Sequence, residues 1–327
     1  MTTPSSHPYD QLTPDVILDA VETTGRRCDG HFLALNSYEN RVFQVGIEDE
    51  RPLVVKFYRP DRWPDIAIHE EHSFTADLAS HEIPVVAPLT DDKGETLFVH
   101  AGFRFALFTR KGGHTPPVDD PDALAMLGRF LGRIHAIGEI KRFSHRPSLD
   151  VQTFGWQAKA HVLTSGLLPT EYIASYQSLC DELLQAVEQV FEAVQPRQIR
   201  LHGDCHPGNI LWTDHGPHFV DMDDCRMGPA AQDLWMLLDS DPIIRQSQLA
   251  PLLEGYQQFR DFDYSELALI EPLRALRLVH YTAWLAQRWN DPAFPAAFPW
   301  FGNRRYWEEY LNDLVAQLGQ LQGTSDN

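Results

Sequence analysis

The sequence predicts an α+β protein with two lobes, a smaller N-terminal lobe over residues 1–110 and a larger, mainly helical C-terminal lobe over residues 111–327. Alternating apolar and polar segments, which are typical of strands, are concentrated in the first part of the chain. Apolar residues at helical spacing dominate the second part. The length of 327 residues supports two lobes, because it exceeds what one small core usually organises.

The N-terminal lobe is expected to contain an antiparallel sheet and a helix beside it. A first helix is predicted over residues 13–25, where Thr13 can cap the helix and Pro14 occupies its first position. A hairpin follows, with strands at 41–45 and 53–58 on either side of an acidic turn. The lobe is completed by a helix over 66–80 and strands near 96–100 and 103–109.

The C-terminal lobe is expected to follow a hinge near residues 108–113, where two glycines break the strand pattern. Its helices are predicted over 121–138, 170–193, 230–238, 246–260 and 265–289. Arg274 and Arg277 lie three residues apart on the last of these, which favours a salt-bridged surface helix. The aromatic stretch from Trp284 to Trp300 is too apolar for a free linker and is expected to pack on the helical lobe, beside the cleft between the lobes.

One segment carries a pattern of acidic and amide residues that predicts catalysis. Residues 202–209 read His-Gly-Asp-Cys-His-Pro-Gly-Asn, and residues 219–224 read Phe-Val-Asp-Met-Asp-Asp. The order of Asp204, Asn209 and Asp221 is the catalytic arrangement of kinases. In that arrangement Asp204 receives the proton of the acceptor hydroxyl, and Asn209 and Asp221 hold Mg²⁺. A polar turn explains a single Asp equally well, but it does not require this ordered set.

The chemistry of phosphoryl transfer accounts for these residue types. Negative charge moves between oxygens, so the reaction needs Mg²⁺, whose preferred ligands are carboxylate and amide oxygens. It also needs a proton acceptor beside the attacking hydroxyl. We therefore predict ATP and Mg²⁺ as cofactors, with ATP bound in the cleft between the lobes.

Lys56 interrupts an apolar strand, which is unfavourable unless its ammonium group has a partner. In kinases such a lysine holds the phosphates of ATP and pairs with a glutamate on the next helix. We assign this glutamate to Glu70, which shares a helix face with Phe74 and Leu78, and keep Glu71 as the alternative. A lysine that extends from an edge strand to water is the competing interpretation.

The loop before the second strand contains no glycine-rich phosphate motif, although its backbone amides and the Ser37 hydroxyl are able to contact phosphate. On the pattern alone an ordinary polar turn is favoured.

His202 is expected to hold the catalytic loop, and His206 either lies near the transferred phosphate or is solvated. Asp223 either assists the metal or orients the loop, and Asp233 either caps a helix or anchors the loop.

Composition limits the partners. The formal net charge of −19 argues against non-specific nucleic-acid binding. No apolar run is long enough to cross a bilayer, and the N-terminus lacks the pattern of a secretion signal. The four cysteines are scattered, which favours reduced thiols. A cytoplasmic chain, expected to be monomeric, follows from these observations.

The pattern His-Gly-Asp-x-His-x-x-Asn followed by Asp-x-Asp-Asp resembles the aminoglycoside phosphotransferase and choline kinase superfamily, which has a protein-kinase-like fold. Four further segments resemble a group of bacterial stress-response kinases within it: 36–42, 54–60, 271–275 and 291–295. The resemblance implies a cytoplasmic, ATP- and Mg²⁺-dependent Ser/Thr protein kinase that acts on protein substrates. It also implies Asp204 and Asp221 as active-site residues, Asn209 and Asp221 as Mg²⁺ ligands, and Ser37 as an ATP-site residue.

Three other functions remain open at this point. The first is a small-molecule kinase on the same fold, of the aminoglycoside, choline or homoserine kinase type; a deep acidic pocket would favour it, and an open groove would favour a polypeptide acceptor. The second is a metal-dependent hydrolase that uses His202, Asp204, His206 and Asp221, which would leave Lys56 without a role. The third is a nucleotide-binding module without catalysis, against which the complete residue set argues.

Overall fold

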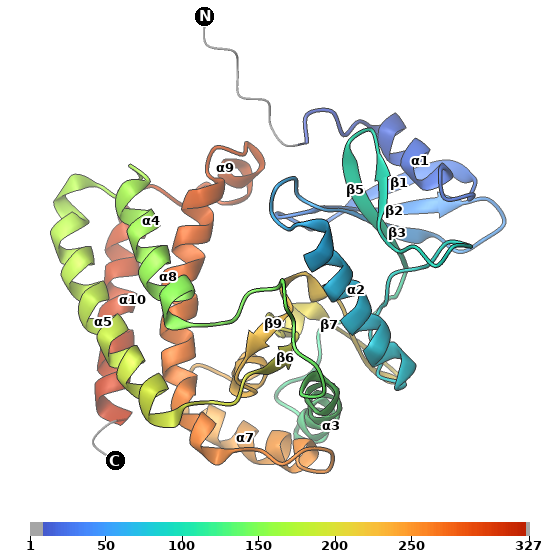
Figure 1. Ribbon diagram of the computed structural model, residues 1–327. Coiled ribbons are helices and arrows are strands. Elements are labelled where there is room, and N and C mark those ends of the chain that lie inside the picture. Colours follow the sequence, from blue (N-terminus) through green and yellow to red (C-terminus); the bar gives the residue numbers. More distant parts are fainter. Residues whose placement is uncertain (1–8, 325–327) are drawn as a thin grey trace, which may run out of the picture.

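The computed structural model describes residues 9–324. Residues 1–8, where the sequence predicts no secretion signal, lie outside this range. The N-terminal lobe is a five-stranded antiparallel sheet in the order β1-β2-β3-β5-β4, which confirms the predicted α+β class (Figure 1). Its elements are α1 (Pro14–Glu22), β1 (Cys28–Leu35), β2 (Arg41–Ile47), β3 (Leu53–Phe57), α2 (Asp65–Ser80), β4 (Phe98–His100) and β5 (Phe103–Thr109).

Successive side chains of a strand point to opposite faces of the sheet, so one face is apolar and the other faces the C-terminal lobe. On β3, Val55 and Phe57 are fully buried in the core that the sheet forms with α1. Lys56 lies between them and points to the opposite face, toward the other lobe. Helix α2 lies between the lobes: Ile68 packs under the sheet, whereas Phe74 and Leu78 belong to the core of the C-terminal lobe.

The C-terminal lobe is mainly helical and contains two short antiparallel strand pairs, β6 with β9 and the hairpin of β7 with β8. In Figure 1, α4, α5, α8 and α10 form one helical group, and α3 and α7 form another beneath the strands. Its elements are α3 (Pro121–Gly138), α4 (Ala158–Thr164), α5 (Ile173–Val194), β6 (Ile199–Leu201), β7 (Ile210–Thr213), β8 (Gly216–Phe219), β9 (Arg226–Gly228), α6 (Ala231–Trp235), α7 (Pro242–Tyr256), α8 (Ile270–Arg288), α9 (Ala293–Ala297) and α10 (Arg304–Thr324).

Each predicted helix is present at the predicted position, although the first and last residues of some helices differ by a few positions. Helix α3 has the predicted bounds, because Asp120 caps it and Pro121 occupies its first position. Helix α7 begins at Pro242, four residues before the prediction, since Asp241 accepts a hydrogen bond from the Ile243 amide and starts the helix there.

Helix α10 was not among the predicted elements, although its sequence carries a helical signal. Its buried residues recur at intervals of three and four: Trp307, Tyr310, Leu314, Leu318 and Leu321. Aromatic residues around its start obscure this period. The helix packs against α5 and α8 and so completes the helical group.

Helices α3 and α7 approach each other so closely that glycine is required. A methyl group on Gly128 would collide with the Leu252 carbonyl oxygen. Gly128→Ala should therefore lower the free energy of unfolding by about 1–3 kcal/mol, as overpacking does in other cores. Gly319→Ala on α10 is the control, because a methyl group there meets nothing within 4 Å. It should raise stability by about 0.5–1 kcal/mol through helix propensity. Urea unfolding followed by circular dichroism checks both values, and equal effects would contradict the close helix contact.

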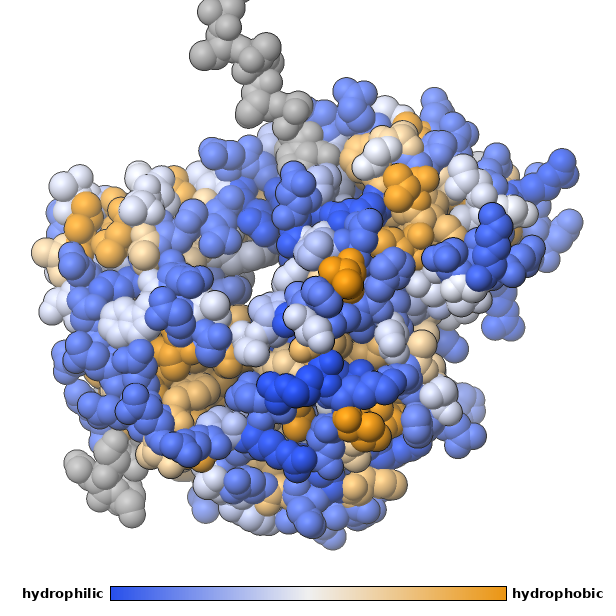
Figure 2. Space-filling model, in the orientation of Figure 1, coloured by the Kyte–Doolittle hydropathy of each residue, from blue (hydrophilic) through white to orange (hydrophobic). Residues whose placement is uncertain are grey.

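The face seen in Figure 2 is predominantly hydrophilic, with isolated hydrophobic patches, and is hollowed between the helical group and the N-terminal lobe. Across residues 9–324, no helix combines the length and apolar character that a membrane span requires. All four cysteines are free, as the sequence predicts: Cys28, Cys180, Cys205 and Cys225. The hollow between the lobes leads to the candidate site.

Candidate active site

Asp204 lies on a loop that leaves β6 and is held close to the segment before β9. Gly203, the preceding residue, has a φ of +85°, a conformation that L side chains rarely adopt. A methyl group on it would also collide with the Asp224 carbonyl oxygen. Glycine is therefore required for the chain to turn and to present Asp204 to the hollow between the lobes.

Asp233 anchors this loop from α6, which decides between its two predicted roles. Its fully buried carboxylate accepts hydrogen bonds from the backbone amides of His202 and Gly203, both at 2.8 Å, and lies 3.1 Å from His135 Nε2. Burial alone would raise the pKa of Asp233, but its hydrogen bonds outweigh burial and hold the pKa below its usual value. His202 also holds the loop, as predicted, through its ring contact of 2.9 Å with the Val220 carbonyl oxygen.

Asp233→Asn should destabilise the fold, because an amide cannot accept both backbone hydrogen bonds and leaves a buried donor unsatisfied. We expect a loss of about 2–3 kcal/mol in the free energy of unfolding. Asp241→Asn is the matched control, since asparagine caps a helix about as well as aspartate. Chemical denaturation measures both. An Asp233→Asn protein as stable as the control would refute the anchoring role.

Asp221 and Asn209 face a cavity between the lobes, which we call the interlobe cavity. Asp221 follows β8 in a left-handed conformation with φ of +58°, an arrangement that is strained for a residue other than glycine and is common at functional sites. Its side chain is 54% exposed, in contrast to the buried Asp223 two residues later. Asn209 donates from its amide to the Asp204 backbone oxygen at 2.9 Å. The Val220 amide donates to the Asn209 carbonyl oxygen at 3.0 Å, which holds the loop of Asn209 against the loop of Asp221.

Lys56 lies on the opposite wall of this cavity and pairs with Glu71, not with Glu70. Lys56 Nζ lies 2.7 Å from Glu71 Oε1, and both side chains are buried. Burial alone would lower the pKa of Lys56, but Glu71 and neighbouring carboxylates hold it well above the usual value. The same ammonium lies 4.0 Å from Asp221 Oδ1, so it links the N-terminal lobe to the catalytic loops.

The prediction that Glu70 pairs with Lys56 is wrong. Glu70 instead accepts hydrogen bonds from the backbone amides of Ser144, His145 and Arg146, at 2.7, 3.0 and 3.0 Å. The face of α2 that points to Lys56 contains Ile68, Glu71 and Thr75, rotated by about one residue from the assumed face. Apolar spacing alone did not show this, because α2 is buried on two sides.

The interlobe cavity has a volume of about 360 Å³ and walls from both lobes. Lys56 Nζ lies 4.0 Å from Asp221 Oδ1, and the Asn209 carbonyl oxygen accepts from the amide of Val220, the residue before Asp221, so these three residues meet at what we call the polar end of the cavity. Thr109 and Lys111 add further polar groups to the lining. Apolar side chains from β2, β3, β5 and β7 line the rest: Val42, Val54, Phe108 and Leu211. Ser37 lines the cavity from the β1–β2 loop, and its hydroxyl donates to the Asn40 carbonyl oxygen at 3.0 Å. This division suits a ligand with one flat apolar part and one highly charged part.

The residues at the polar end fit a divalent cation. Confinement in the cleft, with Asp223 and Asp224 close by, raises the pKa of Asp221 to about 6 despite the nearby Lys56 ammonium. A hard cation at this carboxylate would relieve that clustered negative charge. Asn209 uses its amide nitrogen for Asp204, which leaves the amide oxygen as the group for a cation. Within residues 9–324, no group of three or more His, Cys, Asp or Glu side chains is placed to hold a metal.

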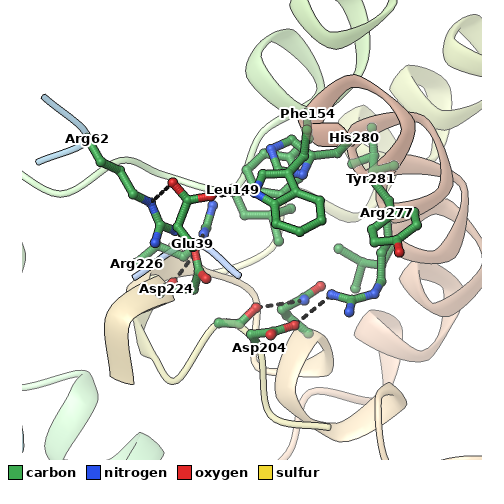
Figure 3. A pocket seen from close by; sticks show the side chains of 15 residues that line it. Glu39, Arg62, Leu149, Phe154, Asp204, Asp224, Arg226, Arg277, His280 and Tyr281 are labelled. Atoms are coloured by element: carbon green, nitrogen blue, oxygen red, sulfur yellow. Dashed lines mark hydrogen bonds and ion pairs between the residues drawn. The ribbon is translucent and has the colours of Figure 1, made fainter. Parts of the chain in front are cut away.

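Asp204 lines a second, smaller pocket of about 190 Å³, the Asp204 pocket (Figure 3). Arg277 points across it from α8, with one guanidinium nitrogen 2.7 Å from Asp204 Oδ1. The sequence predicted a salt-bridged helix here, and Arg277 does form an ion pair, but its partner Asp204 lies on the loop after β6 and not on α8. The opposite wall carries Arg62, Arg226 and Asp224, while Phe154, His280 and Tyr281 form an aromatic side. Spacing within α8 gave no signal for this contact, because the partner is 73 residues away.

Glu39, a further residue of the Asp204 pocket, was also missed. It lies in the β1–β2 loop two residues after Ser37, yet it lines the Asp204 pocket. Its carboxylate accepts hydrogen bonds from Trp284 Nε1 at 2.7 Å and from Arg288 at 2.9 Å, both on α8. The stretch from Trp284 to Trp300 therefore lies beside the cleft, as predicted, and it fastens the N-terminal loop to the helical lobe.

Asp223 also holds the β1–β2 loop in place. Its carboxylate accepts a hydrogen bond from Asn40 Nδ2 at 3.0 Å and pairs with Arg62. These contacts favour the positioning role among the two predicted for Asp223.

His206 lies 3.6 Å from the Asp204 carboxylate and is half-buried, and burial lowers the pKa of its ring, so that it is neutral near pH 7.

Comparisons with known proteins identify a matching family and named relatives. The model of the phosphotransferase enzyme family matches residues 31–270. The chain is 45% identical over 318 residues to stress response kinase A of Escherichia coli K12, covering 97% of this chain and 96% of that protein. It is 44% identical over 309 residues to a Salmonella typhimurium protein named serine/threonine protein kinase RdoA, covering 94% and 93% of the two chains.

Solved structures share the fold at lower identity. An amicoumacin kinase in complex with AMP-PNP, Ca²⁺ and its antibiotic has a TM-score of 0.65 at 19% identity, covering 87% of this chain and 89% of that one. A spectinomycin phosphotransferase in complex with ADP and spectinomycin has a TM-score of 0.65 at 13% identity, covering 98% and 99%. The chain belongs to the phosphotransferase enzyme family and is a homologue of stress response kinase A.

Proposed function

We propose that this chain is an ATP- and Mg²⁺-dependent kinase that transfers the γ-phosphate of ATP to Ser or Thr hydroxyls of proteins in a bacterial stress response. The observation that carries the proposal is the pairing of two adjoining pockets: an interlobe cavity that ends at Lys56, Asn209 and Asp221, and an outer pocket that contains Asp204. Its relatives named stress response kinase A and serine/threonine protein kinase RdoA support the acceptor class.

In this mechanism the apolar part of the interlobe cavity takes the adenine and the polar end takes the phosphates. Lys56, held rigid by Glu71, neutralises phosphate charge, and Ser37 and the loop amides cover the phosphates. Asp204 accepts the proton of the acceptor hydroxyl and orients it in line with the γ-phosphate. Mg²⁺, when bound at Asn209 and Asp221, supplies charge neutralisation to the phosphates.

The charge balance of the Asp204 pocket supports a protein acceptor over a small cationic one. Three acidic and three arginine side chains line it and pair with one another. Arg277 pairs with Asp204 at 2.7 Å, while Arg62 and Arg226 pair with Asp224 at 2.8 and 2.7 Å. A pocket for an amino alcohol or an aminoglycoside needs uncompensated negative charge, and these arginines remove it.

The other hypotheses lose support on physical grounds. A metal-dependent hydrolase would need His202, Asp204, His206 and Asp221 to converge on one ion, and within residues 9–324 no group of three or more His, Cys, Asp or Glu side chains is placed to do so. His202, which it would use as a ligand, already holds its ring against the Val220 carbonyl oxygen. A small-molecule kinase remains the alternative to test, because the fold serves both acceptor classes.

The test is a competition among acceptors. The purified chain is incubated with γ-labelled ATP, Mg²⁺ and equal concentrations of a dephosphorylated protein mixture, choline, homoserine and an aminoglycoside. The proposal predicts label on Ser and Thr of proteins, with at least a tenfold preference in rate. Label predominantly on a small molecule would overturn the acceptor class, and label released only as inorganic phosphate would overturn kinase activity.

A further inference from the structure

A large groove continues from the Asp204 pocket along the surface between α8 and α10. Its volume is about 760 Å³, several times that of the Asp204 pocket. The two share Arg277 and Tyr281, so these side chains form the boundary that a bound molecule would cross. We call this surface the α8–α10 groove. Its size exceeds what a serine or threonine side chain requires, so an acceptor that fills both spaces must be extended.

The α8 wall of this groove carries an arginine whose charge is not balanced by a carboxylate. Arg274 donates to the backbone oxygens of Asp239 at 3.0 Å and Ser240 at 3.4 Å. Its Nε is buried and has no hydrogen-bond partner within residues 9–324. The nearest acidic residue on the same wall, Glu271, is already engaged by Arg245 at 2.8 Å and Gln317 at 2.8 Å. Asp313 lines the same groove from α10, so the groove carries both signs of charge, and Arg274 is the cation of its α8 wall that forms no ion pair among residues 9–324.

We propose that the α8–α10 groove binds the polypeptide segment that flanks the acceptor Ser or Thr, and that Arg274 pairs with an acidic side chain of that segment. This inference rests on the proposed protein kinase function and adds a substrate preference to it. Arg274 and Arg277 lie one helical turn apart, so their side chains are about 5–6 Å apart along the groove. An extended chain advances roughly 3.3 Å per residue, which places the acidic side chain within roughly two to four residues of the acceptor.

The test compares two peptides that differ only in charge. Each carries one central serine, flanked on both sides by aspartates in one peptide and by lysines in the other. The measured quantity is the ratio of kcat/KM for the aspartate peptide to that for the lysine peptide. This ratio cancels any difference in the fraction of folded enzyme. Wild type should prefer the aspartate peptide, and Arg274→Glu should lower the ratio by about tenfold or more, since it reverses the charge that meets the peptide.

Arg305→Glu is the matched control, because it makes the same charge change on an exposed arginine of α10 that pairs with its neighbour Glu309 and lines neither the groove nor the Asp204 pocket. It should leave the ratio at the wild-type value. Equal ratios for wild type and Arg274→Glu, with both peptides phosphorylated, would overturn the groove inference and leave the proposed function intact. Failure to phosphorylate either peptide, together with rapid phosphorylation of a small amino alcohol, would overturn the proposed function itself.

Discussion

Asp204→Asn should lower kcat for phosphoryl transfer by about 10²- to 10⁴-fold, the range that a general base usually contributes. The amide keeps the shape of the side chain but cannot accept a proton from the acceptor hydroxyl. Nucleotide affinity should change little, because Asp204 lines the outer pocket and Lys56, Asn209 and Asp221 line the interlobe cavity. Fluorescent-nucleotide binding and steady-state transfer assays separate the two quantities.

The control for this variant is Asp214→Asn, an exposed aspartate in the turn between β7 and β8. It makes the same chemical change ten residues away, on a side chain that lines neither pocket, and should keep wild-type kcat. An Asp204→Asn enzyme with more than a tenth of wild-type turnover would contradict the assignment of Asp204 as the base. Loss of nucleotide binding in that variant would instead show that Asp204 supports the fold of the site.

Glu71→Gln should lower kcat/KM for ATP by about 30- to 150-fold. The change removes the charge that balances the buried Lys56 ammonium, and removal of one partner from a buried pair usually costs about 3–5 kcal/mol. We expect a cost at or below the lower limit of that range, about 2–3 kcal/mol, because Asp223 and Asp221 lie 3.7 and 4.0 Å from Lys56 Nζ and retain part of the attraction.

Glu70→Gln is the informative comparison, because the two glutamates are adjacent and the sequence favoured Glu70. Its carboxylate caps the amides of residues 144–146 and does not reach Lys56. The variant should lose thermal stability but keep kcat/KM for ATP within about threefold of wild type. Steady-state kinetics at varied ATP concentrations measure kcat/KM for both variants. A larger kinetic loss in Glu70→Gln than in Glu71→Gln would contradict the observed pairing.

Local patterns predicted the fold class and much of the site. A lysine that interrupts an apolar strand predicted a partner for Lys56, and the order of Asp204, Asn209 and Asp221 predicted two loops that the structure brings together. Both signals are local: the apolar strand around Lys56 and the fixed spacing of Asp204 and Asn209 span a few residues. The contact between Asn209 and Asp204 likewise spans only five residues.

The predictions that failed depended on contacts between distant segments. Arg277 meets Asp204 only after α8 packs beside the catalytic loop, and Glu39 meets Trp284 and Arg288 only after the lobes come together. Glu70 and Glu71 differ by one helical position, about 100° of rotation, and a helix buried on two sides has no single apolar stripe to show which glutamate faces β3. Tertiary packing supplies this information.

The most direct measurement of the central claim is quantitative phosphoproteomics of bacterial cells that lack their own copy of this gene and express either wild type or Asp204→Asn. If Asp204 is the base of a Ser/Thr protein kinase, a set of phosphoserine and phosphothreonine sites should be present with wild type and lost with the variant, at equal protein abundance. The acidic preference inferred for the α8–α10 groove should appear as aspartate or glutamate near those sites. Identical phosphoproteomes, with both enzymes expressed and folded, would contradict the central claim.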